Sequence, residues 1–261
     1  MLQSAALSQP MPVTQPTRRT LTVVPATTGA KSAIACSSCC LRETCLPCGL
    51  GGADIGRFDE ITAAKRKIAK GQSLYLVGNA FESLYAVRSG AFKTISVSRH
   101  GEEKVTGFHM PGELLGLDAI NTGSHSYNAV ALEDSEVCVI PFQRLEQLAM
   151  TMPALQHQLL RLLSSDISRD HGLMLLLGSL TAEQRVAAFL LSLSKRHQRL
   201  GFSASRFVLR MTREEMGNYL GLTIETVSRL MSRFQREGLI ALKQRDIELK
   251  DPERLREIVG N

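Results

Sequence analysis

Five of the six cysteines in this 261-residue chain lie within thirteen positions, at Cys36, Cys39, Cys40, Cys45 and Cys48. Free cysteine packs well as a small apolar residue, but packing does not explain five of them in one polar segment flanked by proline and glycine. Clustered thiolates bind soft metal ions or iron–sulfur clusters, or pair as disulfides. The segment therefore predicts one of these three chemistries.

The compartment decides between a metal and disulfides. The sequence has no run of eighteen apolar residues, so we expect no membrane contact. Arg18 and Arg19 precede a short apolar run, but Pro25 and Lys31 interrupt it before it reaches the length of an export signal. We therefore expect a cytoplasmic protein whose thiols stay reduced, which favours a metal.

The spacing of the thiols limits the choice of metal site. Cys36, Cys39, Cys45 and Cys48 form a C-x2-C-x5-C-x2-C pattern, whereas a zinc ribbon usually separates its two pairs by a dozen or more residues. Three clustered cysteines and one remote cysteine, such as Cys138, would supply the four thiolates of a 4Fe–4S cluster. Spacing alone leaves an iron–sulfur cluster, zinc and a redox or structural thiol role open.

The rest of the chain divides by its periodicity. Residues 1–32 are rich in Ser, Thr, Gln and Pro and predict a disordered tail. Residues 54–70 place apolar side chains at helical spacing, so we expect a short helix. From residue 71 to residue 141 the period is two, with strands expected within 74–77, 85–97, 105–109, 128–132 and 136–140. Many short strands predict a small barrel or sandwich.

A long helix is expected to start at Pro153 and to carry a heptad seam. The apolar seam residues are Leu160, Leu163, Ile167, Met174 and Leu177. Asp170 takes the sixth seam position, where two like carboxylates facing each other across a two-fold axis would oppose association. We expect a dimerisation helix; the alternative is that Asp170 lies at the edge of a face packed within the subunit.

Helix start signals follow near the C-terminus. A helix is expected over about 182–198, and a second begins where Thr212 can cap and Glu215 can close a capping box. After a turn at Gly221, Thr223 can cap a further helix that runs to about Glu237. Two short helices joined by a glycine turn predict a helix-turn-helix. Residues 238–249 then predict a hairpin, or wing, and Pro252 starts a short last helix.

The outer face of the second of these helices carries side chains that can contact DNA. Glutamate accepts from cytosine and arginine donates to guanine. Between residues 206 and 245, eight basic residues oppose four acidic ones, which is most of the net charge of +6. This charge argues against a merely solvated polar face. The candidate DNA-binding residues are Thr223, Glu225, Thr226, Ser228, Arg229 and Arg233.

Taken together, these features resemble the cyclic-AMP receptor superfamily, and in detail its branch of oxygen-responsive fumarate–nitrate regulators. The resemblance covers about residues 36–250. It rests on Cys36-x2-Cys39-x5-Cys45-Leu-Pro47, Leu84-Tyr-Ala-Val-Arg-Ser-Gly90, Val137-Cys138-Val-Ile-Pro-Phe142 and Gly217-Asn-Tyr-Leu-Gly-Leu-Thr-Ile-Glu-Thr-Val-Ser-Arg229. It implies an α+β fold with an N-terminal β-roll of the cyclic-nucleotide-binding type, a long dimerisation helix and a C-terminal winged helix-turn-helix.

The resemblance also implies a division of the chain into domains. These are a tail (1–32), a cluster-binding segment (33–52), a sensor β-roll (53–150), a dimerisation helix (151–180) and a DNA-binding domain (181–261). In such a regulator Cys36, Cys39, Cys45 and Cys138 would hold one 4Fe–4S cluster per subunit. Asp170, beside Leu163, Ile167 and Met174 in the seam, would keep the cluster-free protein monomeric.

The implied function is global control of transcription in the anaerobic response. Glu225, Ser228 and Arg229 would read a TTGAT-like half-site in each arm of an inverted repeat in double-stranded DNA. Residues 97–103 would touch RNA polymerase. The protein would act as a homodimer, and it would not be an enzyme. Two alternatives remain open: a zinc- or thiol-based regulator on the same scaffold, and a C-x2-C redox enzyme or electron carrier, which would leave the winged helix unexplained.

The sequence departs from the family pattern in two places. Cys40 and Cys48 are additional to the four ligands, and Cys48 competes with Cys138 for the fourth position. A cyclic-AMP receptor needs an Arg-Ser pair for the phosphate, and this chain has His125-Ser126, with Leu115 in place of the acidic residue for the ribose. A phosphodiester without its arginine lacks a bidentate partner, so we expect no cyclic nucleotide.

Overall fold

The computed structural model describes residues 35–62 and 64–260, so the expected tail at 1–32 lies outside the described residues. Its centre is a pair of four-stranded antiparallel sheets with the strand orders β1-β8-β3-β6 and β2-β7-β4-β5. The strands are β1 (Lys65–Ile68), β2 (Ser73–Tyr75), β3 (Ser83–Ser89), β4 (Phe92–Val97), β5 (Glu103–His109), β6 (Leu114–Leu115), β7 (Asn128–Ala131) and β8 (Ser135–Pro141). Each predicted strand region contains a strand, and the fold class is confirmed.

The space between the sheets is filled by a buried apolar cluster. It includes Ile68, Leu74, Val87, Phe92 and Val137, each at most 1% exposed. Strands β2 and β7 are buried at every position, so the apolar side chains of this cluster face one another while the opposite faces of these strands are also covered. The short helix η2 (Leu117–Ala119) follows β6.

The predicted helix over 54–70 is wrong in its second half. Helix α1 (Gly52–Ile61) ends at its C-cap, Thr62, whose hydroxyl donates to the Phe58 carbonyl oxygen at 3.0 Å. Residues 65–68 then form β1, in which Lys65 lies opposite Cys138 of β8. Pairing with β8 places Ile68 in the core between the sheets, and this tertiary gain outweighs the local helical pattern.

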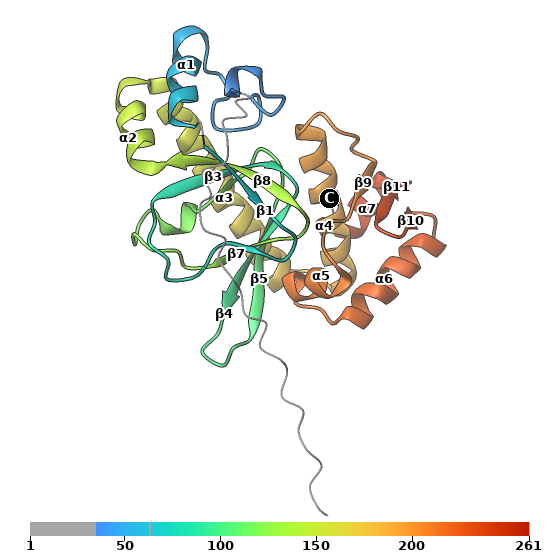
Figure 1. Cartoon of the computed structure of the whole chain (residues 1–261). Coiled ribbons are helices and arrows are strands. Elements are labelled where there is room, and N and C mark those ends of the chain that lie inside the picture. The colour runs from blue at the N-terminus through green and yellow to red at the C-terminus, as the bar shows by residue number, and fades with distance from the viewer. Residues whose placement is uncertain (1–34, 63, 261) are drawn as a thin grey trace, which may run out of the picture.

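Two elements connect the β-roll, predicted to be the sensor domain (residues 53–150), to the rest of the chain. Helix α2 (Phe142–Thr151), which the sequence periodicity did not predict, buries Leu145, Leu148 and Ala149. Helix α3 (Pro153–Ser179) starts at the predicted proline and runs 27 residues behind the sheets (Figure 1). The cysteine-rich segment, with the short helix η1 (Cys36–Ser38), lies beside α1 at one end of the β-roll, with α2 on the other side of α1 (Figure 1).

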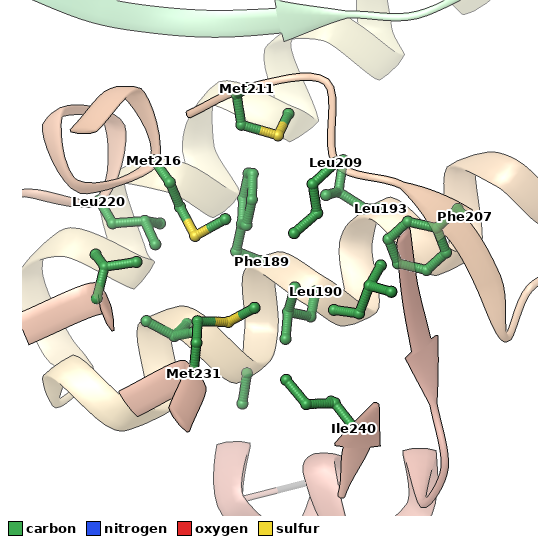
Figure 2. Close-up of a cluster of buried hydrophobic side chains, with 14 of the residues drawn as sticks. Phe189, Leu190, Leu193, Phe207, Leu209, Met211, Met216, Leu220, Met231 and Ile240 are labelled. Carbon is green, nitrogen blue, oxygen red and sulfur yellow. The ribbon is translucent and has the colours of Figure 1, made fainter. Parts of the chain in front are cut away.

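The C-terminal domain forms around α4 (Ala182–Arg199). It contains α5 (Arg213–Leu220), α6 (Ile224–Arg236), α7 (Pro252–Val259) and a sheet of β9 (Arg206–Val208), β10 (Ile240–Lys243) and β11 (Asp246–Leu249) in the order β10-β11-β9. The predicted hairpin is β10–β11, and β9 adds a third strand that was not predicted. Figure 2 shows Phe189 and Leu190 of α4 among Met216, Met231 and Ile240 from the other elements.

Candidate thiol site and nucleic-acid interface

The cysteine-rich segment is held on the sensor domain by its leucines. Leu46 and Leu50 are at most 1% exposed and pack in one cluster with Phe58 of α1 and Leu145 of α2. Tight turns shape the segment, since the Cys45 amide donates to the Leu41 carbonyl oxygen at 2.9 Å. Burial of Leu46 and Leu50 therefore anchors their sequence neighbour Cys45 on the β-roll side of the segment.

Four thiols from two distant parts of the sequence line one small cavity of about 20 Å³. They are Cys36, Cys39, Cys45 and Cys138, the last of which comes from β8. Neither Cys40, which is exposed, nor Cys48 is among the lining residues. The structure thus brings together the four ligands that the family resemblance implied, rather than the two C-x2-C pairs.

Burial favours the protonated form of the thiols that line the cavity when no metal is bound. Burial, reinforced by neighbouring thiols, raises the pKa of Cys45 to about 12 and that of Cys138 to about 11. Burial likewise raises the pKa of Cys36. A metal ligand must be a thiolate, so binding would release these protons.

The donor set fits an iron–sulfur cluster, which takes one thiolate per iron. In the part of the chain that the structure describes, no three Cys, His, Asp or Glu side chains stand at metal-ligating separations as they are. The cavity has room for about one water, so binding a cluster would require the cysteine-rich segment to move.

Side chains from α1, its C-cap and α3 contact the candidate ligand residues and were not found from the sequence. The Cys36 amide donates to Asp59 Oδ1 at 2.5 Å, and Cys36 Sγ lies 3.5 Å from Thr62 Oγ1. From α3, Gln158 Nε2 donates to the Cys45 carbonyl oxygen at 3.4 Å. The last contact joins the thiol segment directly to the predicted dimerisation helix.

The face of α3 that carries the predicted seam is open to solvent in the single subunit. Leu160, Ile167 and Met174 are 59%, 57% and 70% exposed. They follow each other at intervals of seven, so they form one apolar row. Asp170 is also exposed and lies on the same helix, with Leu163 half-buried.

The helix-turn-helix forms as the sequence predicted. Thr212 and Glu215 make a reciprocal capping box at the start of α5, and Gly221 ends that helix in a left-handed conformation. The side chain of Thr223 accepts from the Thr226 amide and caps α6. The predicted end of α6 near Glu237 is its C-cap.

Gly217 allows the two helices to meet closely. A Cβ atom at this position would lie 2.6 Å from the Leu222 carbonyl oxygen, in the backbone of the turn. We expect Gly217→Ala to lower the free energy of unfolding by about 1–3 kcal/mol, because this contact outweighs the gain in helix propensity. Denaturant unfolding measures the change.

Gly56→Ala is the matched control, because Gly56 lies within α1 with no atom near the added Cβ. That variant should gain up to about 1 kcal/mol. Equal effects of the two substitutions would contradict the assigned role of Gly217.

The predicted DNA-reading residues divide into two groups. Glu225 and Arg229 are exposed on α6, with Ser228 half-buried beside them. Thr223 and Thr226 are joined by hydroxyl contact at 3.2 Å within the cap, and Arg233 is ion-paired with Glu183 and Glu237. Those three residues have structural contacts within the domain. Glu225 and Arg229 are exposed, and Glu225 also interacts with the side chain of Thr223.

The region that would take a cyclic nucleotide borders a cavity of about 530 Å³ between the β-roll and α3, whose lining includes Leu115, Asp118 and Ser126. His125 is 3% exposed and stacks on Tyr75 with 3.7 Å between ring centroids. Asp118 lies 3.6 Å from His125 Nδ1 and accepts from the Ser126 amide at 2.7 Å. Leu115 is buried in the core between the sheets.

No helix within the described ranges is both long enough and apolar enough to cross a membrane.

A β-roll joined by a long helix to a winged helix-turn-helix defines a class of DNA-binding transcription regulators. Two family models match this chain: a cyclic nucleotide-binding domain over residues 65–152 and a Crp-like helix-turn-helix domain over residues 184–258. The chain belongs to the CRP/FNR family of transcriptional regulators, and it is a regulator rather than an enzyme.

Known relatives match this chain over nearly their whole length. It is 48% identical over 225 residues to the transcriptional activator protein Anr of Pseudomonas protegens, covering 86% of this chain and 92% of that protein. It is 44% identical over 229 residues to the fumarate and nitrate reduction regulatory protein of Escherichia coli, covering 88% and 92%. The structure of FixK2 from Bradyrhizobium japonicum matches with a TM-score of 0.69 and 31% identity, covering 75% and 96%.

Proposed function

We propose that this chain is an oxygen-responsive regulator of the anaerobic response, in which Cys36, Cys39, Cys45 and Cys138 hold one 4Fe–4S cluster per subunit. The observation that carries the proposal is that these four thiols, and neither of the other two, line one cavity. A cluster bound there would supply an oxygen-labile link between the cysteine-rich segment and β8. Relatives named as regulators of fumarate and nitrate reduction support the same physiological role.

The packing around the thiols explains how their state would reach the dimerisation helix. Leu155 of α3 is fully buried in the cluster that contains Leu46 and Leu50, and Leu159 and Leu162 pack against it. With the hydrogen bond from Gln158 to Cys45, these contacts join the thiol segment to the first half of α3. A rearrangement of the segment would therefore shift the apolar row on α3.

The apolar row on α3 would be covered in a homodimer. Association would bury Leu160, Ile167 and Met174 against their copies and place the two Asp170 carboxylates near each other. The two α6 helices would then enter successive major grooves of double-stranded DNA about one turn apart, at an inverted repeat of TTGAT-like half-sites. The loop over residues 97–103, between β4 and β5, is exposed and would meet RNA polymerase.

The test is an anaerobic absorbance spectrum of the purified full chain with iron and sulfide analysis, repeated after admitting air. We expect iron and sulfide in equal amounts, about four of each per subunit, since the cluster holds four irons. We also expect absorbance that bleaches in air together with loss of dimer. A colourless zinc protein, or a cluster indifferent to air, would contradict the proposal and leave the zinc- or thiol-based regulator.

The Thr62 hydroxyl is expected to slow the reaction of the site with oxygen. It now donates to the Phe58 carbonyl oxygen and lies 3.5 Å from Cys36 Sγ, so it can turn to donate to a coordinated thiolate. Hydrogen bonds to cluster sulfurs withdraw electron density and disfavour oxidation. Thr62→Val should therefore bleach about three- to tenfold faster in air.

Stopped-flow absorbance measures this rate, with resonance Raman of the iron–thiolate stretch as an independent readout. Thr62→Ser, which keeps the hydroxyl, is the matched control and should behave as the unaltered protein. Equal rates for the valine and serine variants would assign Thr62 to helix termination alone.

A further inference from the structure

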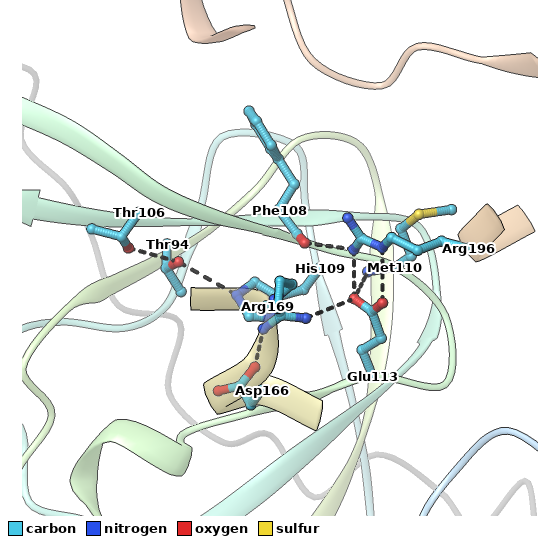
Figure 3. Close-up of polar contacts among 9 residues, drawn as sticks. All are labelled: Thr94, Thr106, Phe108, His109, Met110, Glu113, Asp166, Arg169 and Arg196. Carbon is cyan, nitrogen blue, oxygen red and sulfur yellow. Dashed lines mark hydrogen bonds and ion pairs between the residues drawn. The ribbon is translucent and has the colours of Figure 1, made fainter. Parts of the chain in front are cut away.

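Glu113 lies at the point where the sensor domain, α3 and the DNA-binding domain meet (Figure 3). Arg196 of α4 binds both of its oxygens, with Nε to Oε1 at 2.9 Å and Nη2 to Oε2 at 2.6 Å. Arg169 of α3 places Nη1 3.8 Å from Oε2, and the Met110 amide donates to the same oxygen at 2.9 Å. One carboxylate therefore holds a guanidinium from each of two helices.

The contact is shielded and charged. The side chain of Glu113 is 18% exposed, and Arg196 Nη2 also donates to the Phe108 carbonyl oxygen at 2.6 Å. Burial alone would raise the pKa of Glu113, but Arg196 and Arg169 outweigh it and lower the pKa to about 2. The bidentate pair is thus present throughout the physiological pH range, in a setting where charge-assisted hydrogen bonds are strongest.

Other contacts between the two domains hold α5 against the sensor. The Val105 amide donates to Asn218 Oδ1 at 2.7 Å, and Lys93 Nζ lies 2.7 Å from Glu215 Oε1. Glu113 differs from these in that it meets α3 as well as α4. Arg169, its partner on α3, is next to Asp170 and is also ion-paired with Asp166. A shift of α3 on association would therefore reach Glu113 directly.

We propose that Glu113 is a positioning residue that fixes the angle of the DNA-binding domain on the dimerisation helix, through Arg196 on one side and Arg169 on the other. The inference rests on the proposed function, because it concerns how the dimer places its two recognition helices. Helix α4 packs with α5 and α6 in one core, so fixing α4 fixes α6. Two helices held at one spacing bind a paired site without the cost of orienting free domains.

The test compares the unaltered full chain, loaded with its cluster, with Glu113→Gln, which keeps the shape and removes the charge. Fluorescence anisotropy measures binding to three duplexes: an inverted repeat at the preferred spacing, the same repeat with two base pairs inserted, and a single half-site. We expect the variant to bind the preferred repeat about tenfold more weakly. Its binding to the half-site should be unchanged, so its preference for the correct spacing should shrink by the same factor.

Arg196→Gln should reproduce this result, and Arg254→Gln is its matched control. Both substitutions remove one positive charge from the DNA-binding domain, but Arg254 is exposed on α7 and paired only locally, with Glu257. Arg254→Gln should weaken the three duplexes equally or not at all. Sedimentation should show that Glu113→Gln with its cluster dimerises as the unaltered protein does.

The inference is overturned if Glu113→Gln keeps the full spacing preference, or if it loses affinity for the half-site and the repeat to the same extent. A failure of the proposed function would show instead in the unaltered protein, as absence of the cluster or of binding to the repeat.

Discussion

Cys138→Ala is expected to abolish the iron–sulfur site, with iron content falling from about four per subunit to near zero. A cubane cluster takes one thiolate per iron, and Cys138 is the one cavity-lining thiol that β8 contributes. Without it the cysteine-rich segment has no covalent link to the sensor sheet. Anaerobic affinity for the inverted repeat should fall about a hundredfold. A complete two-state switch would need a difference of roughly ten-thousandfold, so we expect the variant to lose part of that range.

The control for this prediction is built into the chain. Cys48→Ala and Cys40→Ala each remove a thiol that does not line the cavity, so both variants should keep their iron and their anaerobic DNA binding. Iron and sulfide analysis with a gel-shift assay measures all three variants. If Cys48→Ala lost the cluster and Cys138→Ala kept it, the fourth ligand would be the second C-x2-C cysteine and the cavity would be misassigned.

The fold was predictable wherever local pattern and tertiary packing agree. The period of two from Gly71 to Pro141 gave the strands, and the capping signals at Thr212 and Thr223 gave the helix-turn-helix. Where the two disagree, the prediction is wrong: Ile68 fits the helical spacing of residues 54–70, but pairing of β1 with β8 decides its conformation. The local sequence contains no sign of a partner strand seventy residues away.

The candidate sites also divide into features that local sequence predicts and features that depend on contacts between distant residues. Motif spacing picked out the five clustered cysteines and the outer face of α6, because both depend on residues close together in the sequence. Cys138, about ninety residues away, was assigned by the family resemblance. Arg233 stays a candidate DNA-binding residue, but the motif could not show that its side chain is also ion-paired with Glu183, fifty positions earlier on α4. Glu113 and Arg196 were missed for the same reason, since neither belongs to a local pattern and their meaning comes from the contact itself.

Asp170→Ala is expected to make the protein a dimer in air. In the proposed dimer, two like carboxylates would face each other in an apolar seam with Ile167 and Met174, and this repulsion opposes association. Removing both charges should strengthen dimerisation without the cluster by about ten- to a hundredfold, or about 1.4–2.8 kcal/mol. The variant should then bind the inverted repeat aerobically, where the unaltered protein does not.

Aerobic sedimentation equilibrium measures the association, and a gel-shift assay in air measures the binding. Asp170→Glu keeps the charge and should remain monomeric in air, so it separates repulsion from any effect of changing the side chain. Asp134→Ala removes a carboxylate from the loop between β7 and β8, where it accepts from the Lys70 amide, and should leave association unchanged. A monomeric Asp170→Ala would place the control of association elsewhere, with Arg169 and its link to Glu113 the next residues to test, because they connect the same turn of α3 to the DNA-binding domain.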